Sequence, residues 1–316
     1  MKKKLVHWLK VSVVVFGWSL TPVIGDYLID DNQLSAYQLA FFRYFIAALA
    51  LYVMLRFQTD IKNKDIVNSL RERWKAYLII SIPSAFMPVL LFLAVRTTTG
   101  SSASFLLNAN IILIPIVAFV IIREKIKKSY IIALGFSVIG LFFVIFDESL
   151  LNLGTLSIGD LTGNLLAFGS GFCWALYTVF LKKFFSEENP LLVTFLSLLM
   201  GSIYLVFFAF LMPPTEMTIN WLGIILIIVI AVVSTSLAYS YWLDILSYLS
   251  TTQTGIIQAL VPLFSVVWSV SFLGDRISYF FGIGAVLIVA SIILVERKKK
   301  EKIEVENLHE LLSSEK

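Results

Sequence analysis

Charged residues are scarce in this sequence. Asp, Glu, Lys and Arg together make up 15% of its 316 residues, while 59% are hydrophobic. An average globular domain is about one quarter charged and about half apolar. The shortage of charge therefore excludes an ordinary soluble protein, a disordered chain and a nucleic-acid-binding domain. It favours a helical protein that crosses a membrane several times.

Cysteine and histidine are nearly absent as well. Cys173 is the single cysteine, so no intrachain disulfide can form, and the two histidines, His7 and His309, lie near the ends of the chain. A His/Cys metal site within the membrane and a Ser–His–Asp triad are therefore not expected. We predict no catalytic residue, no metal ligand and no cofactor. The chain also lacks the phosphate-binding motif G-x-x-x-x-G-K-[ST], which argues against direct ATP coupling.

Long apolar runs occupy most of the chain. A helix needs about 20 mostly apolar residues to cross a bilayer. Ten segments meet this requirement: Val11–Leu28, Tyr37–Leu55, Tyr77–Val95, Ser102–Ile122, Tyr130–Phe146, Leu161–Leu181, Leu191–Met212, Trp221–Leu243, Thr252–Leu273 and Tyr279–Val295. The predicted fold is therefore all-α, a polytopic membrane protein with ten transmembrane helices.

The distribution of charge predicts the orientation. With an N-terminus in the cytosol and alternating spans, nearly all of the 25 basic residues fall on the cytosolic side. Basic residues mark the cytosolic side of membrane proteins. We therefore expect a multi-pass protein of the cell membrane with both termini in the cytosol.

The two halves of the chain resemble each other. Residues 129–135, Ser-Tyr-Ile-Ile-Ala-Leu-Gly, match residues 278–284, Ser-Tyr-Phe-Phe-Gly-Ile-Gly. Each half contains five predicted spans, and because five is odd the second half is inverted in the membrane. We predict one five-helix repeat at 8–147, a second at 159–297, and a cytosolic tail at 298–316. Inverted repeats with a binding site at their interface are a recurrent plan of secondary transporters.

Several short motifs resemble those of the EamA-type family in the drug/metabolite transporter superfamily. The resemblance spans roughly residues 8–297, and four stretches carry much of it: Phe41-Phe42-Arg43-Tyr44, Arg123-Glu124-Lys125-Ile126, Gly159-Asp160-Leu161 with Trp174-Ala175-Leu176-Tyr177, and Gly274-Asp275-Arg276-Ile277. The chain departs from the family pattern at Phe16, where Trp is usual, and at Asp275, where Glu is usual. The resemblance implies ten helices around a central cavity and movement of small metabolites or drugs, often outward.

Arg43 lies within a predicted span and Asp244 directly follows another, in regions where charge is costly and often functional. Arg43 would anchor a carboxylate or another anion, or would instead be a structural residue that reaches outward to Asp26, Asp30 or Asp275. Asp244 lies near the cytosolic end of its span. It would be a proton-linked coupling group, or simply an interfacial carboxylate at the end of a helix.

Further candidates for substrate binding or gating are uncharged. Asn108, Asn110 and Gln258 would line a cavity or hydrogen-bond neighbouring helices. Asn108 and Asn110 are about 200° apart around a helix, so both are not expected to face one cavity. The aromatic candidates lie away from the membrane interfaces where Trp and Tyr usually occur, and they would form a cavity wall or simple helix packing: Trp18, Trp174, Tyr177 and Tyr239.

These observations predict a secondary transporter that exports small metabolites such as amino acids by alternating access. An exporter of drugs or other cationic compounds is the alternative. A carrier of sugar phosphates or nucleotide sugars is less favoured, because Arg43 is the only cation within a predicted span and a phosphate would require several. A membrane enzyme or a non-transporting sensor lacks its expected sequence features. The expected partners are a small-molecule substrate and the lipid bilayer, without nucleic acid. Proton coupling is compatible with the sequence, and nothing in it sets the oligomeric state.

Overall fold

The computed structural model describes residues 2–30, 34–124, 132, 135–136, 138–140, 142–144, 158–211, 217–242, 251–291 and 294. Within these residues the chain is helical, and no strand is found. The elements are α1 (Lys2–Asp30), α2 (Ala36–Gln58), α3 (Asn63–Ala94), α4 (Gly100–Leu107), α5 (Asn110–Ile122), α7 (Ile158–Phe185), α8 (Pro190–Leu211), α9 (Trp221–Ala231), the π-helix η2 (Val232–Leu237), α11 (Thr251–Trp268) and the π-helix η3 (Ser269–Leu273).

Seven helices among the described residues are long and apolar enough to cross a membrane. They correspond to the predicted spans one to four and six to eight. Two shorter apolar helices, Leu260–Leu273 and Tyr279–Ser291, fall within the predicted ninth and tenth spans. Most of the predicted fifth span, Tyr130–Phe146, lies outside the described residues. An all-helical protein with multiple apolar helices is therefore established, while the count of ten stays a prediction.

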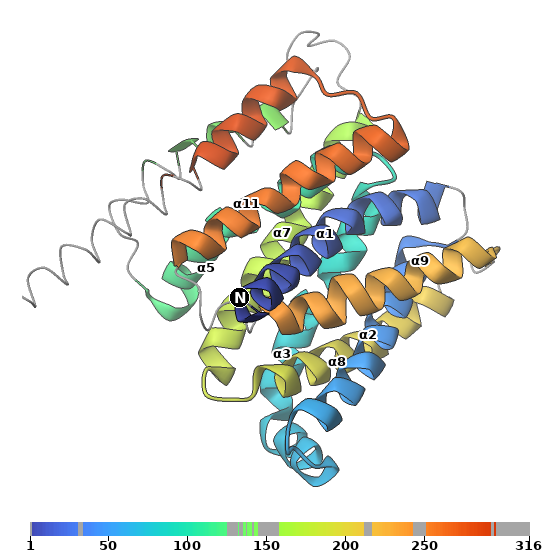
Figure 1. The fold of residues 1–316 in the computed structure, drawn as a ribbon, viewed down its shortest axis with the longest axis vertical. Helices are drawn as coiled ribbons and strands as arrows, with labels where there is room; N and C mark the ends of the chain where they lie inside the picture. Colours follow the sequence, from blue (N-terminus) through green and yellow to red (C-terminus); the bar gives the residue numbers. More distant parts are fainter. Residues whose placement is uncertain are drawn as a thin grey trace, which may run out of the picture.

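The helices pack into one bundle (Figure 1). α3 packs against α7 and α8, α2 packs against α8, and α1 lies alongside α11. The main core therefore joins segments from both halves of the sequence. By contrast, Phe45, Leu49 and Val53 recur every four residues on one face of α2 and are about half exposed. An outer surface of this composition suits contact with lipid better than contact with water.

The predicted fourth span, Ser102–Ile122, is long enough to cross a membrane, but its helix is interrupted by a turn at Asn108 and Ala109. It is broken between α4 and α5, because two asparagine side chains there bond the backbone. The Asn108 amide donates to the Ser104 carbonyl and the Asn110 amide donates to the Leu107 carbonyl, both at 2.8 Å. Such local bonds compete with the regular helical pattern. Expecting a continuous helix here was wrong.

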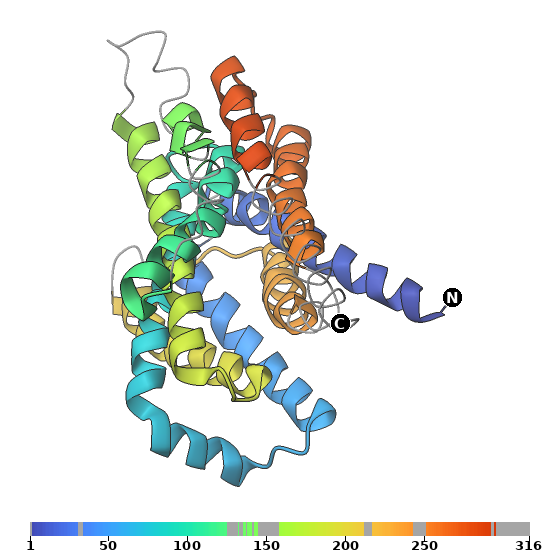
Figure 2. The ribbon, with the colours of Figure 1, turned by 90° about the vertical axis from the view of Figure 1, so that its left-hand side faces the viewer.

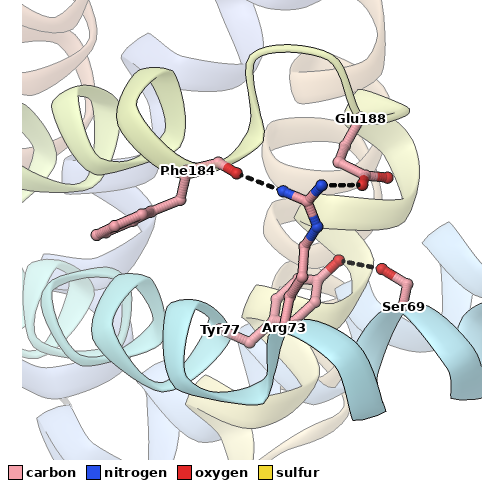
Figure 3. A network of polar contacts seen from close by, with 5 residues as sticks. All are labelled: Ser69, Arg73, Tyr77, Phe184 and Glu188. Carbon is pink, nitrogen blue, oxygen red and sulfur yellow. Dashed lines mark hydrogen bonds and ion pairs between the residues drawn. The ribbon is translucent and has the colours of Figure 1, made fainter.

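The helix that contains the predicted third span begins before Tyr77, at Asn63, and it is kinked at Arg73, whose backbone angles are not helical. Figure 2 shows the first part of α3 bent away from the remainder at the bottom of the bundle. The Arg73 guanidinium donates to the Phe184 carbonyl at 2.8 Å and pairs with Glu188 at 3.2 Å (Figure 3). Beside it, Ser69 and Tyr77 share a hydrogen bond of 2.9 Å across the kink. These contacts attach the kink to the end of α7 and to the segment that follows it.

Candidate functional site

A cavity lies between the two halves of the chain. It contains about 610 Å³ of space free of protein atoms, including the part that opens to its surroundings. α1, α2, α3, α4, α5, α7, the helical turn after η2, and α11 all contribute to its wall. The lining residues are Trp18, Thr21, Arg43, Met87, Leu91, Ser104, Leu107, Asn108, Asn110, Trp174, Tyr239 and Val261.

Arg43 is the only charged residue among the described residues that line this cavity. Its side chain is only 3% exposed, and its Nε donates to the Thr235 hydroxyl at 2.9 Å. The guanidinium carbon lies 5.9 Å from the centre of the Phe92 ring. Nη1 is buried without a hydrogen-bond partner. A buried, incompletely bonded guanidinium is unfavourable unless another group satisfies it.

The alternative role for Arg43 was an outward ion pair with Asp26, Asp30 or Asp275. Within the described part of the chain, Arg43 forms no ion pair. The Asp30 side chain lies outside the described residues. The partner that the structure provides is instead Thr235, a neutral hydroxyl from the second half of the sequence. The positive charge of Arg43 is therefore not neutralised by a described carboxylate.

The π-helix η2 explains how Thr235 is presented to Arg43. The Thr235 hydroxyl donates to the Ile230 carbonyl at 2.9 Å, five residues earlier, so its oxygen is free to accept from Arg43. The Ser236 hydroxyl contacts the Ala231 carbonyl, also five residues earlier, and the Ala47 carbonyl of α2, each at 3.1 Å. π-helical segments are rare and occur frequently at functional sites. Here η2 joins α9 to α2 beside Arg43.

Three aromatic residues form another part of the cavity wall. The ring centres of Trp18 and Trp174 are 6.4 Å apart, those of Trp18 and Tyr239 are 6.1 Å apart, and those of Trp174 and Tyr239 are 5.4 Å apart. Aromatic pairs at such distances contribute about 0.5–1.5 kcal/mol each beyond the burial of their surface. The indole Nε1 of Trp18 is buried without a hydrogen-bond partner. The three rings therefore pack against one another, and the indole Nε1 of Trp18 is left as an unsatisfied hydrogen-bond donor.

Asn108 and Asn110 both line the cavity, contrary to the expectation from helix geometry. The 200° separation applies only to a continuous helix. Because α4 ends before Asn108 and α5 begins at Asn110, the chain turns between the two residues. Both side chains can then face the same space. The expectation that Asn108 and Asn110 would not face one cavity was therefore wrong. The reason is the break between α4 and α5.

The other three predicted residues are not among the described lining residues. Tyr177 lies behind Trp174, with ring centres 5.7 Å apart, and its hydroxyl shares a hydrogen bond of 3.1 Å with Ser197. Its place is to support the aromatic wall. Gln258 lies in α11, but its side chain is outside the described residues, and Asp244 is outside them altogether. Their roles stay predictions.

Sequence reasoning did not single out several residues of the wall. Thr21 follows Trp18 by three residues, and Ser104 precedes Asn108 by four, so each lies on the same helical face as a predicted residue. That spacing could have identified them. No comparable signal marks Met87, Leu91 or Leu107, because apolar residues in apolar helices do not reveal whether they face lipid, protein or a cavity.

The comparisons with known proteins agree with this architecture. The sequence profile of the EamA-like transporter family matches residues 8–146 and again residues 161–297. The transporter YyaM of Bacillus subtilis (strain 168), described as uncharacterized, is 26% identical over 292 residues, which cover 90% of this chain and 93% of YyaM. The threonine/homoserine exporter RhtA of Escherichia coli (strain K12) is 31% identical over 170 residues, about half of each chain: 53% of this one and 55% of RhtA.

A solved structure also has this fold. A chain described as "Crystal structure of protein" superposes with a TM-score of 0.63 over 92% of this chain and 96% of its own, at 13% sequence identity. That likeness concerns the fold alone. The two profile matches together cover most of the sequence, and their family consists of transporters in membranes. The chain therefore belongs to the EamA-like transporter family.

Proposed function

We propose that this transporter exports small metabolites that carry a carboxylate, amino acids above all, and that Arg43 binds the carboxylate. One observation carries the proposal: the Arg43 guanidinium is buried in the cavity wall and its Nη1 has no hydrogen-bond partner. A carboxylate offers the planar pair of acceptors that guanidinium donors fit best. The similarity to RhtA, a threonine/homoserine exporter, supports both the outward direction and the substrate class.

The aromatic wall would accommodate the other end of an amino acid. No acidic residue is among the described residues that line the cavity, so a substrate ammonium group would have no carboxylate partner there. It would instead lie against the faces of Trp18, Trp174 and Tyr239, which attract cations. A zwitterion with its carboxylate at Arg43 would thus be bound with little unpaired charge.

We propose that transport occurs by alternating access between two inverted five-helix repeats, residues 8–147 and 159–297, which together form ten transmembrane helices. The cavity supports this mechanism, because its lining residues come from both proposed repeats. A rocking motion of one repeat against the other would expose such a site to each side in turn. In the proposed orientation both termini lie in the cytosol. We also propose that Asp244 couples transport to the movement of protons.

Export of cationic compounds is the second candidate, because the three aromatic rings would also suit a quaternary ammonium ligand. The charge of Arg43 opposes it, since a cation in the same small cavity would be repelled. A dianionic phosphate is disfavoured for the opposite reason, since Arg43 would be its only cation in the described wall.

Purified protein in liposomes tests the proposed function. Liposomes loaded with a panel of radiolabelled metabolites, including amino acids and organic cations, should release amino acids faster than protein-free liposomes. The panel is repeated with and without a pH gradient to detect proton coupling. Release of none of the compounds in either direction would sink the proposal, and release of the cations alone would favour the second candidate.

A further inference from the structure

A groove lies at the kink of α3, apart from the central cavity. It is lined by Glu72, Arg73, Trp74, Lys75, Ala76 and Phe184, and it contains about 740 Å³ of space free of protein atoms, including the part open to its surroundings. Arg73, at the centre of the lining, is already attached to Phe184 and Glu188 (Figure 3). The groove is therefore a feature of the fold, set by the contact between α3 and the end of α7.

The groove carries an excess of positive charge. Lys75 lies on its lining with its Nζ 5.6 Å from the centre of the Trp74 ring, and the Nζ of Lys183 lies 5.5 Å from the centre of the Phe184 ring. In the described part of the chain neither lysine forms an ion pair. Among the lining residues one carboxylate, Glu72, opposes the two cations Arg73 and Lys75. Beside the lining, Glu188 pairs with Arg73 and Lys183 lies over the Phe184 ring, so these two charges offset each other. One positive charge is left, which matches one phosphodiester.

The position of the groove points to lipid as the source of that phosphodiester. It directly precedes Tyr77, which is fully buried and starts the packed part of α3. Trp74 is 51% exposed in the groove wall, and Phe57, in the last helical turn of α2 before the chain turns into α3, is 86% exposed. Exposed aromatic rings beside lysines at the end of a membrane span are typical of the headgroup region. A soluble acidic ligand would not need these apolar neighbours.

We propose that this groove binds the headgroup of a singly charged anionic phospholipid from the surrounding leaflet. Lys75 and Lys183 would contact the phosphodiester, while Trp74 would pack against the glycerol and the upper acyl chain. The proposal requires only that α3 leaves the bilayer at this end, so it does not depend on which substrate the central cavity binds.

Native mass spectrometry of the full chain in detergent tests the proposal. The protein is titrated with palmitoyl-oleoyl phosphatidylglycerol and, separately, with the phosphatidylcholine that has the same acyl chains. The wild type should bind one phosphatidylglycerol at least tenfold more tightly than phosphatidylcholine. The double variant Lys75→Gln/Lys183→Gln should lose most of this preference, because each lysine near a lipid phosphate contributes separately.

The matched control is Lys62→Gln/Lys64→Gln, which removes the same charge at and beside the start of α3, before the helix reaches the groove lining at Glu72. It should keep the preference. Equal loss in both double variants, no loss in the groove variant, or no preference in the wild type would overturn the proposal. So would an oligoglutamate peptide that displaces the lipid, since it would indicate a protein partner. If the double variant does not fold, the single variants Lys75→Gln and Lys183→Gln are titrated in its place. Each should lose part of the preference for phosphatidylglycerol.

Discussion

Replacing Arg43 with glutamine should reduce transport of carboxylate substrates by about 10- to 100-fold. A hydrogen bond to a charged group contributes about 1.5–3 kcal/mol, and 1.4 kcal/mol corresponds to a factor of ten. Arg43 is the only charged residue of the described cavity wall, so no other cation there can replace it. The measurement is the initial rate of amino acid efflux from liposomes at equal amounts of inserted protein.

The stability of the same variant separates a binding role from a structural one. The Nη1 of Arg43 is buried without a partner, so removing the charge should leave the melting temperature unchanged or raise it. Thr235→Val removes the one described hydrogen-bond partner of Arg43. It should lower transport by about fivefold, or about 1 kcal/mol, a smaller effect because Thr235 positions the guanidinium and leaves the charge in place. Arg71→Gln, an exposed arginine of α3, is the control and should transport normally. Wild-type rates in Arg43→Gln would assign Arg43 a structural role.

Gly171→Ala should destabilise the protein by about 1–3 kcal/mol, the usual cost of forcing extra atoms into a packed interior. A Cβ at Gly171 would lie 2.6 Å from the Leu107 carbonyl oxygen and 3.0 Å from that of Leu106. These are backbone atoms at the end of α4, so a side-chain rotation cannot relieve the overlap. Because Leu107 lines the cavity, α4 would shift and transport should fall as well.

Gly169→Ala is the matched control, two residues away on the same helix. A Cβ there would meet the Leu90 side chain at 3.5 Å, an ordinary contact. This variant should be as stable as the wild type or slightly more stable, because alanine favours helix over glycine by about 1 kcal/mol. Thermal unfolding in detergent measures both. Equal melting temperatures for the two variants would contradict the close approach of α4 to α7.

Much of the fold was accessible from sequence because the membrane imposes a simple rule. Long apolar runs such as Trp221–Trp242 and Pro190–Leu211 must be helical, since no water is present to bond an open backbone. The places where helices break or kink could not be predicted from the sequence. At the break the Asn108 amide bonds the nearby Ser104 carbonyl, and at the kink the Arg73 guanidinium bonds the Phe184 carbonyl of another helix. Hydropathy does not report such contacts.

The sequence identified several of the residues that line the cavity, but it did not identify which residues bond to one another there. Arg43, Trp18, Trp174 and Tyr239 were singled out because polar and aromatic groups are unusual in the middle of a span, and all four line the cavity. The partner of Arg43 was not predicted, because position along one helix does not reveal which helix packs beside it. Thr235 reaches Arg43 only through the π-helix η2, which has no sequence signature here.

The central claim is that the cavity binds a carboxylate, and the most direct test compares an amino acid with the amine formed by removing only its carboxylate. Liposomes containing the wild-type protein are loaded with a radiolabelled amino acid of the class that the metabolite panel identifies, or with the matching amine, and efflux is followed for each. Binding at Arg43 predicts that the amino acid leaves at least tenfold faster than the amine, and that Arg43→Gln abolishes this difference. Equal efflux of both compounds, or efflux of the amine alone, would contradict it.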